Sequence, residues 1–198
     1  MENNELQANI TAAKAGRPEG FQAILSIYGP RLYGYFYRAT ANRHEAEDLV
    51  GEVMLRLVRM LDHYDERGRF EPWLFRIAAN LIRDRIRRRK TSPGGVSLSA
   101  ETPEGGSLTE TLAAEQEAVD CNIMAQEVNE QLMAALDTLD ESTRQMILLR
   151  HFADLSFAEI ATIMDCPLGT ALAKVHRGLK ILRAKLERAQ GRADKQMG

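Results

Sequence analysis

The spacing of its apolar residues is the feature that most constrains this chain. They recur at intervals of three and four over residues 5–90 and again over 116–188, with almost no strand-like alternation. The stretch between is rich in Ser, Thr, Gly and Pro, which is typical of a flexible linker. The pattern predicts an all-α protein of two small helical domains, residues 1–90 and 116–190, with a linker at 91–115 and a polar tail that frays at 191–198.

Several classes of protein are excluded by what the sequence lacks. No stretch approaches the roughly 20 consecutive apolar residues of a membrane span, and the first residues lack the basic and apolar segments of a signal peptide. We therefore expect a cytoplasmic protein without membrane insertion. Cys121 and Cys166 match neither a disulfide framework nor the spacing of zinc ligands, so both are expected to be ordinary thiols and no metal site is expected.

The net charge of -2 hides two blocks of opposite sign. Residues 74–90 carry a net charge of +6, and residues 91–120 carry -6 without a single Lys or Arg. A basic block of this density can bind phosphates, and an acidic one can repel or mimic them. The alternative for the basic block is a solvated helix face.

The first informative segment begins at Asn42, where Asn42 and Glu45 have the spacing of an N-terminal capping box. The helix that follows is predicted to bury one broad apolar stripe, made of Ala46, Leu49, Val50, Val53, Met54, Leu57, Val58 and Leu61. Asp48, Glu52 and Arg56 follow one another at intervals of four on another face. That charged line can face either solvent or a partner.

The second segment, residues 70–90, begins with Pro72 in the first turn of a predicted helix. Its buried side is predicted to contain Leu74, Ile77, Ala78, Leu81 and Ile82. A second face lines up Trp73, Arg76, Asn80, Arg83 and Arg87. Guanidinium groups suit phosphates, an Asn amide can pair with a base edge and an aromatic ring can stack on an unstacked base, so this face favours nucleic-acid binding. The alternative for Trp73 is a place in the core.

The third segment predicts a helix-turn-helix. Asp140 is expected to cap one helix, and Ser156 with Glu159 forms a capping box that opens a short helix ending at Met164. A turn at 165–167 leads to a third helix with Pro167 at its first position. This basic helix would enter the major groove of DNA, the alternative being a plain helical hairpin.

These segments together resemble the sigma-70 family of RNA polymerase sigma factors. The similarity to conserved region 2 rests on Ala46–Val50, Glu52-Val53, Phe70–Asn80, Asp84 and Arg87-Arg88. The similarity to region 4 rests on Leu148–Phe152, Leu155–Ala161 and Gly169–Arg177. With only these two regions and a short linker, the chain looks like the extracytoplasmic-function (ECF) type.

The resemblance implies a transcription initiation factor that binds core RNA polymerase and directs it to promoters. It places Asp48, Leu49, Glu52, Val53 and Arg56 on the clamp of the largest polymerase subunit, and region 4 on the flap of the second-largest. The acidic linker would thread through the polymerase near the RNA path. Members of the family are often held inactive by an anti-sigma factor, which implies such a partner here.

The resemblance also assigns DNA contacts. The loop at 62–69 would form a pocket for melted bases of the minus-ten element, and the contact residues would be Trp73, Arg76, Asn80, Arg83, Asp84, Arg85, Arg87 and Arg88. Readout of the minus-thirty-five element falls to Thr170, Ala173, Lys174, His176 and Arg177. The chain departs from the family pattern at Gly51, usually Gln, and at Leu172 and Ala173, commonly a basic residue and Ser.

Two other classes of function compete with a sigma factor. A stand-alone helix-turn-helix regulator would share region 4 but not the region 2 segments. An enzyme would need a nucleophile with a base, a metal set or a phosphate-binding loop, and His44, His63, His151 and His176 form no such spacing. We therefore expect no enzymatic activity and no cofactor.

Overall fold

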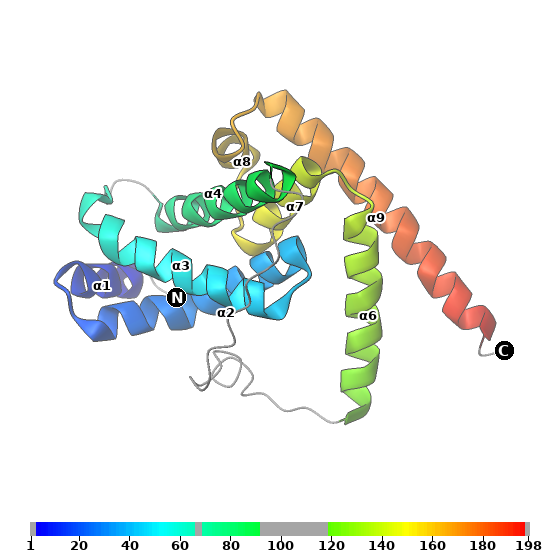
Figure 1. Cartoon of the computed structure of the whole chain (residues 1–198), viewed down its shortest axis with the longest axis horizontal. Coiled ribbons are helices and arrows are strands. Elements are labelled where there is room, and N and C mark those ends of the chain that lie inside the picture. Colours follow the sequence, from blue (N-terminus) through cyan, green and yellow to red (C-terminus); the bar gives the residue numbers. More distant parts are fainter. Residues whose placement is uncertain (1–2, 66–68, 92–118, 197–198) are drawn as a thin grey trace.

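The computed structural model describes residues 3–65, 69–91 and 119–196, and every regular element within them is helical (Figure 1). This confirms the all-α prediction. The elements are α1 (Asn3–Lys14), α2 (Pro18–Thr40), α3 (Arg43–Met60), the 3₁₀ turn η1 (Leu61–His63), α4 (Phe70–Thr91), α6 (Val119–Asp137), α7 (Glu141–Phe152), α8 (Phe157–Ile163) and α9 (Leu168–Gln196). Apart from Thr91, the predicted linker at 91–115 lies outside the described residues.

The first four helices enclose an aromatic and aliphatic core. From α2 it takes Tyr28, Leu32, Tyr35 and Phe36, all at most 1% exposed. The buried side predicted for α4 is confirmed, since Leu74, Ile77, Ala78, Leu81 and Ile82 are all buried. The stripe predicted for α3 is confirmed except at its edge, where Met54 is half-buried and Val58 is 53% exposed. With about 100° between successive residues, Val58 falls outside the arc that Val53 and Leu57 occupy.

The predicted helix starts are confirmed by their hydrogen bonds. Asn42 Oδ1 accepts from the Glu45 N–H at 3.1 Å, and Asp140 Oδ1 accepts from the Thr143 N–H at 3.1 Å. Ser156 and Glu159 form both bonds of the capping box. The second bond of the box predicted at Asn42 is not formed, because the Glu45 carboxylate accepts from Arg85 at 2.8 Å and the Asn42 N–H donates to Thr40 Oγ1. Local chemistry therefore determines where α3, α7 and α8 begin.

The last three helices form the predicted helix-turn-helix around Met146, Leu148 and Leu149, all buried. Pro167 is the N-cap of α9, because its carbonyl accepts from the Ala171 N–H. The sequence predicted it at the first helical position, so the helix begins one residue later than predicted. At its other end α9 continues to Gln196, so residues 191–196, predicted to be a frayed tail, are helical. These residues include no proline and are mostly good helix formers.

The two helical units pack against each other, because α2 lies against α7 and α4 touches α8. Helices α6 and α9 contact each other near the end of α6 that leads to α7 and diverge from there (Figure 1). Among the described residues, no helix is long and apolar enough to cross a membrane.

Candidate nucleic-acid interface

Trp73 lies between the core and the surface. Its ring packs on Tyr64 and Phe70, with centroids 4.9 and 5.6 Å away, and the side chain stays half-buried. Trp73 therefore packs partly in the core and also keeps the partial exposure that a contact with nucleic acid requires. The ring is braced by aromatic neighbours and still presents one part to solvent, which suits a platform for a base.

The polar residues along the same face of α4 lie in line with Trp73. Arg76 is exposed, and the half-buried Asn80 accepts a short hydrogen bond from Arg83. One turn further on, Arg87 pairs with Asp84 at 3.2 Å. The structure thus brings together the aromatic ring, the amide and the guanidinium groups on one side of one helix.

Arg85 projects away from this line and has a structural partner. Its Nε lies 2.8 Å from Glu45 Oε1, and the Glu45 side chain is only 6% exposed. Because this ion pair ties α4 to the start of α3, the side chain of Arg85 anchors two helices. Arg88 is exposed nearby. Residues 66–68 of the predicted base pocket lie outside the described residues.

Two of the α3 residues that the resemblance assigns to the polymerase contact are buried. Asp48 and Glu52 are exposed as expected, and Arg56 pairs with Glu52 at 3.0 Å. Leu49 and Val53 are 7% and 0% exposed, so their side chains belong to the core and support the surface from beneath.

Sequence reasoning missed two apolar residues on the α3 surface. Leu55 is 57% and Val58 is 53% exposed, although both are large aliphatic side chains. Leu55 comes three positions after Glu52 and seven after Asp48, so its place on the charged face was readable from the helical period. This apolar pair and the two carboxylates share the exposed side of the helix, hereafter the α3 face (Asp48, Glu52, Leu55 and Val58).

The recognition helix α9 presents Thr170, Ala173, His176 and Arg177 to solvent. Leu172 is also exposed, at 42%. Lys174 behaves differently, because its ammonium group binds Asp140 Oδ1 at 3.1 Å and also Ser142 Oγ. Lys174 thus joins α9 to the cap of α7, a contact between segments distant in sequence.

The surroundings of Asp140, the N-cap of α7, shift its pKa. Burial alone would raise the pKa of Asp140, but hydrogen bonds from Thr143, Ser142 and Lys174 outweigh it and hold that pKa well below its ordinary value. The carboxylate therefore stays ionised and keeps α7 and α9 together.

Within the described residues, no group of three or more His, Cys, Asp or Glu side chains is arranged to hold a metal ion. Cys166 carries a free thiol in the turn before α9. The arrangement offers contacts for phosphates, bases and a protein partner.

Comparison with known proteins assigns the family. Residues 24–91 match the Sigma-70 region 2 family, and residues 129–182 match Sigma-70, region 4. The chain is 32% identical over 183 residues to ECF RNA polymerase sigma factor SigW of Bacillus subtilis (strain 168), covering 91% of this chain and 96% of that protein. It is 28% identical over 186 residues to the ECF RNA polymerase sigma-E factor of Escherichia coli (strain K12), covering 91% and 94%.

Solved structures share the fold. CnrH, in complex with the cytosolic domain of CnrY, aligns with a TM-score of 0.62 at 20% identity, covering 91% of this chain and 96% of that one. RpoE of Bartonella quintana, in complex with the anti-sigma factor NepR, aligns with a TM-score of 0.61 at 23% identity, covering 84% and 96%. From its two matched regions and its relatives, the chain belongs to the ECF RNA polymerase sigma factors of the sigma-70 family.

Proposed function

We propose that this chain binds core RNA polymerase, directs it to specific promoters and helps to melt them. The observation that carries the proposal is the α4 face, where the half-exposed Trp73, the exposed Arg76 and the half-buried Asn80 lie in line. Unstacking a base costs a few kcal/mol, and a braced aromatic ring beside guanidinium groups can offset that cost by stacking and phosphate contacts. Beside this line Arg83, Arg87 and Arg88 hold the phosphates of the strand, Asp84 orients Arg87 through their ion pair, and Arg85 positions α4 through Glu45.

The α3 face is the proposed contact with the polymerase clamp. Asp48 and Glu52 provide charge. Leu55 and Val58 provide apolar surface that is removed from contact with water when a partner covers it. Arg56 orients Glu52 through their ion pair. Leu49 and Val53 act from the core by setting the position of this face.

Region 4 is proposed to read the minus-thirty-five element through Thr170, Ala173, His176 and Arg177, with Lys174 as a positioning residue. A groove of about 530 Å³, lined in part by Leu136, Val175 and Leu179, lies on the other side of α9. Charged side chains, among them Arg38 and Asp154, also line it, and its apolar part suits the flap of the second-largest polymerase subunit.

The remaining parts of the proposal follow from this role. The chemistry belongs to the polymerase, so the chain itself is not an enzyme, and its place of action is the cytoplasm. An anti-sigma factor is a fitting regulator, as the solved relative RpoE was captured with the anti-sigma factor NepR. A stand-alone helix-turn-helix regulator is the competing function. It is disfavoured because such a regulator would not contain the region 2 that this chain matches.

Run-off transcription with purified core polymerase tests the proposal. The wild-type chain should yield specific transcripts from a cognate promoter, and Trp73→Ala and Asn80→Ala should each reduce them by about tenfold or more. A stacked base contributes about 1–3 kcal/mol, and a good hydrogen-bonded contact to a base edge contributes about the same. On the same promoter with its minus-ten region already unpaired, the defect of both variants should largely disappear. Equal activity of the variants on the duplex promoter would contradict the role of the α4 face.

A further inference from the structure

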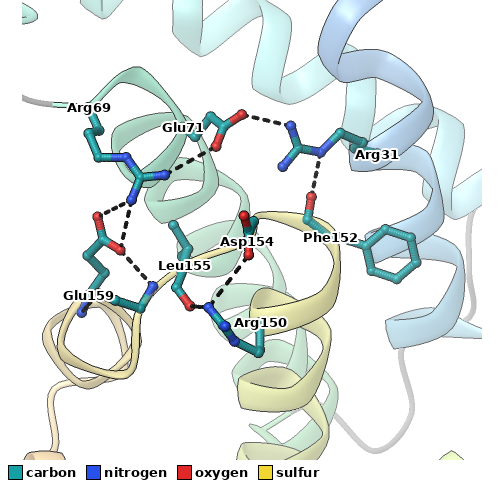
Figure 2. A network of polar contacts seen from close by, with 9 residues as sticks. Arg31, Arg69, Glu71, Arg150, Phe152, Asp154, Leu155 and Glu159 are labelled. Atoms are coloured by element: carbon teal, nitrogen blue, oxygen red, sulfur yellow. Dashed lines mark hydrogen bonds and ion pairs between the residues drawn. The ribbon is translucent and has the colours of Figure 1, made fainter.

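The contact between the two helical units centres on Phe152, the last residue of α7. A Cβ added at Gly34 of α2 would lie 2.5 Å from Phe152 Cε1 and 3.1 Å from Cζ, so the ring occupies a notch that only glycine leaves open. Arg38 lies over the same ring, with its guanidinium carbon 5.3 Å from the centroid. Arg31 Nε donates to the Phe152 carbonyl at 2.6 Å, as Figure 2 shows.

A chain of charges extends this contact to α4 and α8 (Figure 2). Arg31 pairs with Glu71 at 2.8 Å, and Glu71 also lies 3.6 Å from Arg69. Arg69 in turn binds Glu159 at 3.2 Å. Glu159 also accepts from the N–H of Ser156, the N-cap of α8, so one carboxylate serves both the helix-turn-helix and the bridge to the other unit.

The corner that carries Phe152 is itself held in shape. Arg150 Nη1 donates to the Leu155 carbonyl at 2.6 Å and lies 3.6 Å from Asp154 Oδ1. Asp154 has a φ of 48°, which turns the chain sharply between α7 and α8. Since the corner is fixed within region 4, Phe152 and Glu159 meet α2 and Arg69 as one preformed surface.

The energetics of this contact are those of a reversible interface. Beside the packing of α2 on α7, its apolar part at this corner is the Phe152 ring, and its ion pairs are partly exposed, with Arg69 at 56% and Glu159 at 25%. Exposed pairs contribute about 0–1 kcal/mol each. Contacts of this kind between domains of one chain allow opening and closing.

The closed arrangement does not fit the geometry of a promoter. Arg69 directly precedes α4, and Glu159 lies in the first turn of α8, so the two DNA-reading units touch. Elements centred about 25 base pairs apart are separated by about 85 Å of duplex, at roughly 3.4 Å per base pair. A duplex this short is stiff and cannot fold back to bring the two elements together. A polymerase complex that engages both elements therefore holds the two units apart, and a closed chain must open to join it.

We propose that the Phe152 ring in the Gly34 notch, with the Arg31–Glu71–Arg69–Glu159 chain, forms an intramolecular latch that keeps the free chain closed and lowers its affinity for core polymerase. The latch is hereafter these six residues. Its inhibitory role rests on the proposed function. The closed state itself is a property of the free chain and is measurable without polymerase.

Gly34→Gln tests the latch, because it fills the notch with a good helix former and adds no charge. Gly51→Gln is the matched control, since a Cβ there meets nothing within 4 Å. Small-angle X-ray scattering should give Gly34→Gln a radius of gyration about a fifth larger than wild type, as expected for tethered domains. Gly51→Gln should leave the radius unchanged, and circular dichroism should show full helix content in both.

Phe152→Ala opens the same contact from the opposite side and should enlarge the radius in the same way. If both Gly34→Gln and Phe152→Ala stay folded with the wild-type radius, the latch is refuted. A larger radius in both, with the control unchanged, supports it.

Core polymerase affinity tests the inhibitory role. If about nine in ten free chains are closed, opening the latch should tighten binding by about tenfold, because only the open fraction is competent. A larger radius with unchanged affinity would refute the inhibitory role. If neither wild type nor Gly34→Gln binds polymerase, the proposed function fails and the inhibitory role with it, while the scattering result still decides whether the closed state exists.

Discussion

At the scale of single residues, two helical glycines have opposite surroundings. A Cβ on Gly178 of α9 would lie 2.5 Å from Thr143 Cγ2 and 2.7 Å from Ile147 Cδ1, whereas one on Gly51 of α3 would meet nothing within 4 Å. Thr143 cannot turn away freely, because its hydroxyl donates to Asp140 at 2.6 Å. Gly178 therefore allows α9 to approach α7, and Gly51 serves no packing purpose within the described residues.

This contrast predicts opposite effects of the same substitution. Gly178→Ala should lower the free energy of unfolding by about 1 kcal/mol, because overpacking outweighs the gain in helix propensity. Gly51→Ala should raise it by about 0.5–1 kcal/mol. Urea unfolding followed by circular dichroism measures both. Stabilisation by Gly178→Ala would mean that α9 moves away from α7 at little cost.

Asp140 predicts a dependence of stability on pH. Its pKa is lowered in the folded protein, so its contribution to stability is full above its ordinary pKa of 3.8 and is lost as the pH falls toward the lowered value. Asp140→Asn can still cap α7 but cannot titrate. Between about pH 6 and pH 3, wild type should lose more stability than Asp140→Asn. Unfolding curves that fall in parallel would contradict this electrostatic role.

At the scale of helices, the parts of the fold that were predictable are those set by neighbours in sequence. The starts at Asn42, Asp140 and Ser156 depend on side chains two or three residues away, and all three predictions were right. Lys174 was predicted to face DNA but binds Asp140, 34 positions earlier. Such a contact depends on how helices pack, which no local pattern specifies.

The same distinction applies to the candidate sites. The face of α4 follows from one period along one helix, so its residues were correctly grouped. The charged line of α3 was also readable, but Leu49 and Val53 were taken from a motif that mixes exposed and buried positions. The helical period already places Leu49 and Val53 in the buried stripe and Leu55 on the charged face, whereas the exposure of Val58 depends on how α3 packs on α2 and α4.

The α3 face predicts that apolar area contributes to polymerase binding. Leu55→Ala with Val58→Ala should weaken binding to core polymerase by about tenfold, since losing two buried aliphatic groups costs about 1–2 kcal/mol. Val128→Ala is the matched control, because Val128 is 61% exposed on α6, away from this face. Fluorescence anisotropy with labelled chain measures the affinities. Equal weakening by Val128→Ala would show that the loss is not specific to α3.

At the scale of the whole molecule, the latch combines forces that respond differently to salt. The Debye length falls from about 10 Å at 0.1 M to about 3 Å at 1 M, so the Arg69–Glu159 pair, 3.2 Å apart and partly exposed, weakens as salt rises. The Phe152 ring is held in its notch by packing and by the Arg38 guanidinium that lies over it, and the packing responds little to salt. The free chain should therefore open partially, rather than fully, in high salt.

This balance predicts a salt-dependent radius of gyration. The radius of gyration of wild type should increase between about 0.1 M and 1 M NaCl. Arg69→Gln should have a larger radius than wild type at low salt and should change less when salt is added, because the ion pairs made by Arg69 are already absent. Arg183→Gln is the matched control, since it breaks a 2.9 Å pair with Glu187 that lies entirely within α9. It should follow the wild-type curve. If the radius of gyration of Arg183→Gln responds as weakly to salt as that of Arg69→Gln, the effect comes from the loss of any positive charge. If only Arg69→Gln shows the weaker response, the salt sensitivity lies at the contact between the two units.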